Sequence, residues 1–72
     1  MREEINREFG KAIREKRGER PRWEIAAQCG LSPETIGRYE RGEGGPTLTD
    51  AFKIAAAFGC KLSDLLPDEV AA

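Results

Sequence analysis

The sequence predicts an all-α domain of five short helices. Apolar residues recur at helical spacing in several segments, those segments end at glycine or proline, and no stretch shows the alternating pattern of a strand. The chain has 72 residues, 39% of them hydrophobic and 35% charged, so one small core must stabilise the fold. We therefore expect a single domain over residues 1–72, with its core over 5–66 and a frayed tail over 67–72.

The first expected helix spans residues 3–17 and ends at Gly18. Its apolar stripe consists of Ile5, Phe9, Ala12 and Ile13. A short polar connection leads to a second helix over 21–29, with Pro21 in the first turn, where a missing amide donor has no cost. Its inward residues are Ile25, Ala26 and Cys29. Gly30 is the expected left-handed stop.

The third expected helix follows Ser32, a suitable N-cap, and ends at Gly42. Pro33 is a favourable first residue, and the inward positions are Ile36 and Tyr39.

The fourth expected helix begins at Thr47, after the loop GEGGP, and ends at Gly59. Thr47 and Asp50 resemble a capping box. This helix has the most apolar face of the chain, formed by Leu48, Ala51, Phe52, Ile54, Ala55 and Phe58. A brief fifth helix over 62–66 is closed by Pro67.

Several function classes find no support in the sequence. No apolar run approaches the roughly 18 residues of a membrane span, and "MREEINREF" lacks the apolar centre of a signal peptide, so we expect a cytoplasmic protein. Cys29 and Cys60 are 31 positions apart and the chain has no histidine, which gives no metal-site spacing and no activated nucleophile. We expect free, mostly buried thiols, with a disulfide left open, and no enzyme activity, cofactor or small-molecule substrate.

The charge of the chain is uneven. The formal net charge of -1 and the pI of about 5.5 argue against a nucleic-acid partner. Residues 1–42, however, carry ten Lys/Arg against eight Asp/Glu, whereas 43–72 carry two against five. A polyanion would therefore bind the first half of the chain.

The second and third helices are joined by only CGLS, so they are expected to cross steeply. Two short helices joined by a glycine-containing turn, the second with a polar outward face, form the helix-turn-helix pattern, in which that second helix lies in the DNA major groove. The small side chain of Ala26 allows the two helices to approach closely.

The stretch "WEIAAQCGLSPETIGRYERGEGGPTLTDAFKIAAAFGCKLSDLL" resembles the Cro/C1 (XRE) helix-turn-helix family, and the resemblance covers residues 9–66. It implies a five-helix, lambda-repressor-like bundle that binds double-stranded DNA. It also implies base reading by Pro33, Glu34 and Arg38, with Gly37 on the same outward face. Arg38 can bond to guanine, Glu34 can accept from cytosine, and Pro33 can contact a thymine methyl, which indicates a G·C-containing half-site.

The resemblance also implies phosphate contacts around the third helix. Their expected residues are Arg22, Ser32, Thr35, Arg41, Gly45 and Thr47. Family members commonly pair a first-helix arginine with the acid of "YERG", here Arg17 with Glu40. The family often dimerises on palindromes, but no dimerisation segment follows residue 66, so a homodimer is left open.

The sequence departs from the family pattern on the DNA-facing side. The first connection is about two residues shorter than usual, Arg22 replaces a common glutamine, and Glu34 brings a negative charge near phosphates. Trp23 has three open roles: it could cover the shortened connection, pack against a DNA sugar or contact a second subunit. These departures fit an engineered member with a rewritten reading surface and fit a natural sequence equally well.

Two plainer interpretations also stay open. Glu34 and Arg38, four residues apart, could form a solvated ion pair, and the basic residues of 11–22 could be a solvated face. An acidic member of this fold could also act through a protein partner, as an antitoxin-like or adaptor module.

Overall fold

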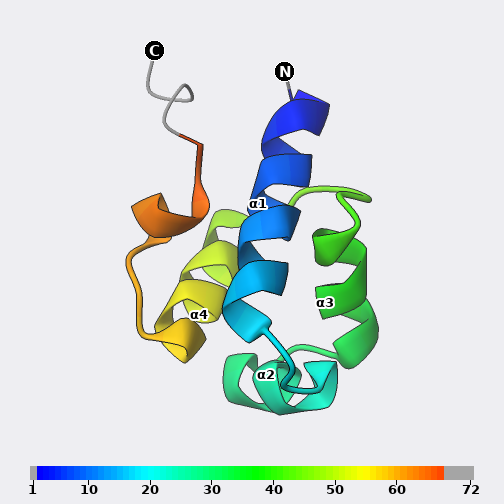
Figure 1. The fold of residues 1–72 in the computed structure, drawn as a ribbon, viewed down its shortest axis with the longest axis vertical. Helices are drawn as coiled ribbons and strands as arrows, with labels where there is room; N and C mark the ends of the chain where they lie inside the picture. Colours follow the sequence, from blue (N-terminus) through cyan, green and yellow to red (C-terminus); the bar gives the residue numbers. More distant parts are fainter. Residues whose placement is uncertain (1, 68–72) are drawn as a thin grey trace.

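Four α-helices and one 3-10 turn form the fold in the computed structural model, which describes residues 2–67 (Figure 1). The elements are α1 (Arg2–Arg17), α2 (Arg22–Cys29), α3 (Pro33–Glu40), α4 (Leu48–Phe58) and the 3-10 turn η1 (Leu62–Leu65). The all-α class is confirmed. All of the predicted tail except Pro67 lies outside the described residues.

The prediction of a fifth α-helix is wrong. Over Leu62–Leu65 the chain makes the tighter 3-10 pattern, in which the Asp64 amide donates to the Lys61 carbonyl at 3.0 Å. Its four residues are too few to build α-helical turns before Pro67. Leu65 is nevertheless buried, so η1 closes one side of the core.

The helices pack around α1, which contacts α3, α4 and η1. In Figure 1, α1 runs down the middle of the molecule, α3 and α4 lie on either side of it, and α2 crosses below them. α2 contacts both α3 and α4. The largest fully buried side chains come from all five elements: Ile13, Ile25, Ile36, Ile54 and Leu65. Phe9 is also buried, while Ile5 and Ala12 are only partly buried.

α1 and α3 are in close backbone contact at Gly10. A Cβ atom added to Gly10 would lie 2.2 Å from the Tyr39 carbonyl oxygen and 2.7 Å from that of Glu40. Both are far below van der Waals contact, so only glycine fits this position without moving one of the helices. This contact fixes the distance between α3 and the body of the domain.

The turn between α2 and α3 has the predicted form. Gly30 adopts a left-handed conformation with φ of 74°, and the Leu31 amide donates to the Ala26 carbonyl at 3.0 Å. Ile25, Ala26 and Cys29 are buried as predicted. α2 begins one residue later than expected, because Pro21 has an extended ψ of 150° and stands at the N-cap. The steep crossing of α2 and α3 is visible in Figure 1.

The apolar face of α4 is narrower than predicted. Ala51, Ile54 and Ala55 are buried, but Leu48 is 69% exposed and Phe52 is 55% exposed. Leu48 is the first residue of the helix, at the edge of the core, and Phe52 points about 100° away from Ala51. Both belong to the predicted apolar face, but neither side chain is buried in the core.

The capping box at the start of α4 is only half formed. The Thr47 hydroxyl accepts from the Asp50 amide at 3.0 Å, as expected. The Asp50 carboxylate instead accepts from the buried Tyr39 hydroxyl at 2.9 Å. Asp50 therefore links α4 to α3 across the core.

Cys29 is buried and Cys60 half-buried, and both thiols are free. Over residues 2–67, no group of side chains has the composition of a metal site. None of the helices in this part of the chain is long and apolar enough to cross a membrane.

Candidate nucleic-acid interface

The start of α3 is fixed by local hydrogen bonds. The Ser32 hydroxyl accepts from the Thr35 amide at 3.1 Å and lies 2.8 Å from the Thr35 hydroxyl. Pro33 occupies the first turn, where its ring suits the helical φ. The predicted N-cap is thus confirmed. The first two residues of α3, Pro33 and Glu34, are exposed.

The two sides of α3 differ sharply. Ile36 and Tyr39 are buried against the core, as predicted. Pro33, Glu34 and Arg38, the three residues expected to read bases, are exposed. No ion pair joins Glu34 to Arg38, and neither has another ion-pair partner among the residues that the structure describes. The charges on this outward side are therefore free to meet a ligand.

Gly37, the fourth expected base-reading residue, is covered by two arginine side chains. It is buried, and a Cβ atom there would lie 3.2 Å from Nη1 of Arg41 and 3.5 Å from Cζ of Arg22. The outward position expected for Gly37 is therefore covered in the free protein. Gly37 instead lets two guanidinium groups rest on the surface of α3.

Glu40, at the end of α3, binds two arginines. Arg17 donates to it through Nε at 2.6 Å and through Nη2 at 3.1 Å, and Arg22 donates through Nε at 3.0 Å. The Glu40 side chain is 2% exposed, and those of Arg17 and Arg22 are 15% and 42% exposed. The expected pairing of Arg17 with Glu40 is confirmed, and Arg22 is an additional partner that the sequence did not indicate.

The charge state of Glu40 depends on this network. Burial would raise the pKa of its carboxyl, but the hydrogen bonds and charges of Arg17 and Arg22 outweigh burial and hold that pKa below its ordinary value. The hydrogen bonds that Arg17 donates to Glu40 raise the pKa of Arg17. Glu40 is thus an ionised, buried carboxylate that ties α3 to α1 and α2.

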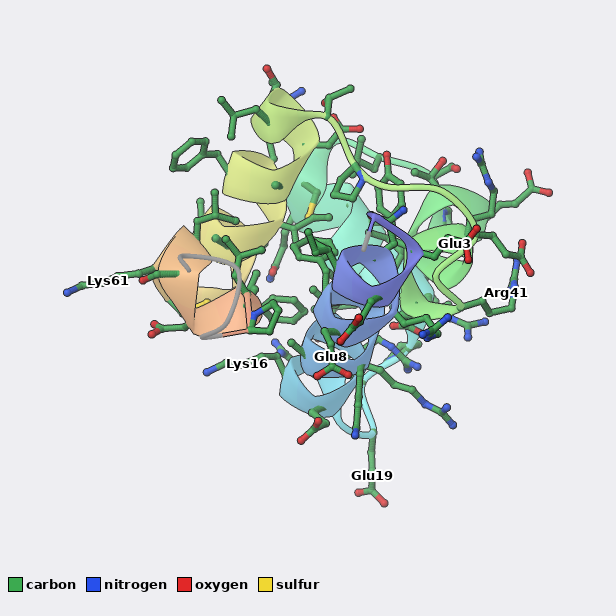
Figure 2. All side chains as sticks on the ribbon, turned by 90° about the horizontal axis from the view of Figure 1, so that it is seen from above. Glu3, Glu8, Lys16, Glu19, Arg41 and Lys61 are labelled. Atoms are coloured by element: carbon green, nitrogen blue, oxygen red, sulfur yellow. The ribbon has the colours of Figure 1, made fainter. Side chains whose placement is uncertain are left out.

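Arg41, expected at a phosphate, is paired with Glu43. Its Nε lies 2.9 Å from the Glu43 carboxylate, and both side chains are at least half exposed. The hydrogen bond from Arg41 lowers the pKa of Glu43. Figure 2 shows the Arg41 side chain beside the end of α3, on the side of the molecule away from Lys61. This surface pair can open at little cost because water screens it.

The remaining expected phosphate residues flank α3 at its two ends. Ser32 is the N-cap of α3 and Thr35 lies in its first turn, and their hydroxyls are already engaged with each other. Gly45 and Thr47 lie in the loop after α3 and are exposed. Gly45 packs against Asn6 of α1, where a Cβ atom would lie 2.5 Å from Oδ1.

A family model described as helix-turn-helix matches residues 11–65. The chain belongs to the Cro/C1-type helix-turn-helix family. The family's helix-turn-helix segment, α2 to α3, carries Arg22 and the candidate base-reading residues.

One curated relative of this helix-turn-helix domain is an uncharacterised HTH-type transcriptional regulator, MJ0272, from Methanocaldococcus jannaschii. It is 43% identical over 42 residues, which are 58% of this chain and 64% of the relative. The chain therefore matches less than two thirds of that regulator's length.

Two solved regulator structures share the fold. The restriction-modification controller protein C.AhdI from Aeromonas hydrophila is 27% identical, with a TM-score of 0.78 over 85% of this chain and 96% of that protein. The P22 c2 repressor, solved with a synthetic operator, is 25% identical, with a TM-score of 0.76 over 81% of this chain and 91% of the repressor. This chain therefore has the helix-turn-helix fold that these two regulators share.

The same fold also occurs within an enzyme. Hydroxypropylphosphonic acid epoxidase from S. wedmorenis is 30% identical, with a TM-score of 0.79 over 88% of this chain but only 35% of the epoxidase. The similarity is thus limited to about a third of that enzyme.

Proposed function

We propose that the chain binds double-stranded DNA sequence-specifically, with α3 in the major groove and phosphate contacts at both ends of α3. The observation that carries this proposal is the division of α3 into a buried side and an outward side that presents Glu34 and Arg38 without ion-pair partners in the described part of the chain. Unpaired charges on the exposed side of such a helix are the groups that a major groove can bind.

Each outward residue has a matching chemical group on the base edges. Arg38 would donate two hydrogen bonds to O6 and N7 of guanine, Glu34 would accept from N4 of cytosine, and Pro33 would contact a thymine methyl. Glu34 costs affinity wherever no cytosine amino group lies opposite, because it then faces the phosphates alone. The expected target is therefore a short half-site that contains G·C pairs.

The two arginines expected to bind phosphate already have ion-pair partners within the domain. Arg22 and Arg41 are bound to Glu40 and Glu43 in the free domain, but both are at least 42% exposed. A phosphate can therefore reach their free donors, and the hydroxyls and amides at Ser32, Thr35, Gly45 and Thr47 would add further bonds. Because Gly37 lies beneath Arg22 and Arg41, DNA would reach its backbone only if these side chains move outward.

Selection from a randomised duplex pool at two salt concentrations tests the function. We expect a short enriched motif containing G and C, bound more weakly at the higher salt because phosphate contacts release counterions. Two spaced copies of the motif would indicate a dimer, which the proposal leaves open. Absence of enrichment at low salt would contradict sequence-specific binding.

Arg38→Ala and Arg22→Ala separate base reading from phosphate binding. Arg38→Ala should weaken binding by about 1 to 3 kcal/mol and relax the preference at one base pair, whereas Arg22→Ala should weaken all sequences about equally. Titration of each variant with the selected duplex and with single-base variants of it measures both effects. If the two substitutions weaken every duplex alike, Arg38 does not read a base.

A protein-interaction module is the second candidate function. The exposed Leu48 and Phe52 on α4 favour it, because apolar side chains at the surface suit a protein partner better than they suit DNA. Binding through such a patch would depend little on salt, unlike binding to phosphates.

We propose no catalysis, cofactor or small-molecule substrate, and we expect the domain to act in the cytoplasm on DNA.

A further inference from the structure

Trp23 is a large aromatic side chain that the fold leaves exposed. It lies in the first turn of α2, directly after Arg22, and is 64% exposed. It does not cover the short connection between α1 and α2, since a covering residue would be buried there. Arg20 of that connection instead lies over the ring of Phe58, 5.6 Å from its centre.

Trp23 forms one wall of a groove between the starts of α2 and α3. The groove has a volume of about 600 Å³ and is lined by Arg17, Arg22, Trp23, Pro33 and Glu34. The indole and the proline ring make it partly apolar. Of its charged residues, Arg22 is the more exposed cation, Arg17 is bound to the buried Glu40, and Glu34 adds a negative charge beside Pro33. A nucleotide backbone has the complementary chemistry, because the deoxyribose has an apolar face and the phosphate beside it is an anion.

The position of the groove favours DNA over a protein as the molecule that binds there. Arg22 and Pro33, which line it, belong to the surface already proposed to lie on DNA, and the groove opens between a candidate phosphate contact and a candidate base contact. A protein bound over Trp23 would cover both residues and compete with the duplex. A DNA strand would occupy the groove in the same complex.

We propose that Trp23 packs against a deoxyribose of the DNA strand beside α3, with its indole Nε1–H donating to the adjacent phosphate and Arg22 neutralising that phosphate. This inference rests on the proposed function. Because every nucleotide carries the same sugar and phosphate, Trp23 contributes affinity and orientation to all duplexes and does not discriminate between bases. It is a positioning residue for the base-reading side chains of α3.

Intrinsic fluorescence tests the inference directly, because Trp23 is the single tryptophan of the chain. The full chain is titrated with a duplex carrying the selected motif and with a scrambled duplex at low salt. We expect both duplexes to protect the indole from acrylamide quenching. Trp23→Ala should weaken both about tenfold and leave their affinity ratio unchanged, while Trp23→Phe should recover most of the affinity.

The thermal midpoint of Trp23→Ala should equal that of the wild type, which rules out a folding effect. Phe52→Ala, which removes another exposed aromatic residue outside the groove, is the matched control and should not change DNA affinity.

If the wild type binds DNA while its indole stays accessible, or Trp23→Ala binds as tightly as the wild type, the inference is wrong and the proposed function stands. If the wild type binds no duplex, the inference about Trp23 and the proposed function are both wrong. A change of emission with protein concentration alone, without DNA, would assign Trp23 to self-association and also overturn the inference.

Discussion

Gly10→Ala is expected to destabilise the domain by about 3 kcal/mol, the largest loss of stability that we predict for a single methyl group. Alanine normally stabilises a helix relative to glycine by about 1 kcal/mol. Here the added Cβ would lie 2.2 Å from the Tyr39 carbonyl oxygen, and that backbone cannot move without moving α3. α1 and α3 would separate and open the core between them.

Thermal unfolding followed by circular dichroism measures the effect, with an expected fall in Tm of about 15 °C. Gly37→Ala is the matched control, because Gly37 is also a helical glycine but its Cβ would meet only the ends of the Arg22 and Arg41 side chains. Those ends can rotate away, so its stability should be unchanged or higher. Equal unfolding temperatures for the two variants would show that α1 and α3 are not in tight contact at Gly10.

Glu40→Gln is expected to destabilise the domain by about 2 to 3 kcal/mol. Glutamine keeps the shape of the side chain but removes the charge that Arg17 and Arg22 share. The side chain is 2% exposed, so water cannot replace the lost partner. Urea unfolding at neutral pH gives the difference in free energy.

The pH dependence of stability provides a second measure of Glu40. Its pKa is lower in the folded domain than its ordinary value of 4.5, so its contribution is complete above pH 4.5 and is lost as pH falls through the folded pKa. The difference in free energy of unfolding between the wild type and Glu40→Gln should therefore disappear in acid. Glu43→Gln removes a carboxylate from the exposed pair with Arg41, and its free energy of unfolding should match that of the wild type at every pH. A stability difference for Glu40→Gln that persists at low pH would count against the charge as its cause.

Local sequence signals were enough to predict most of the fold. Ser32, Gly30 and the apolar spacing of α2 and α3 predict structure through interactions within a few residues, and all were confirmed. The pairing of Arg17 with Glu40 came from the family resemblance. The exposure of Pro33, Glu34 and Arg38 agrees with the prediction, whereas their contacts with bases are still a prediction.

Two contacts that the sequence did not predict depend on distant parts of the chain. Gly10 lies inside a helical pattern, and nothing near it in sequence shows that the backbone of α3 passes beside it. The second bond of Glu40, to Arg22, also depends on how α2 and α3 cross. Leu48 and Phe52 belong to the apolar face expected for α4, but both are exposed because the rest of the chain covers only part of that face.

The division of α3 into two sides has a consequence for how this domain can change over time. Ile36, Tyr39 and Glu40 hold the helix in place, whereas Pro33, Glu34 and Arg38 make no contact that the core requires. Substitutions at these three outward positions can therefore accumulate without compensating changes elsewhere. Evolution or a designer can treat the domain as a scaffold, in which new target preferences arise while the inherited stability is kept.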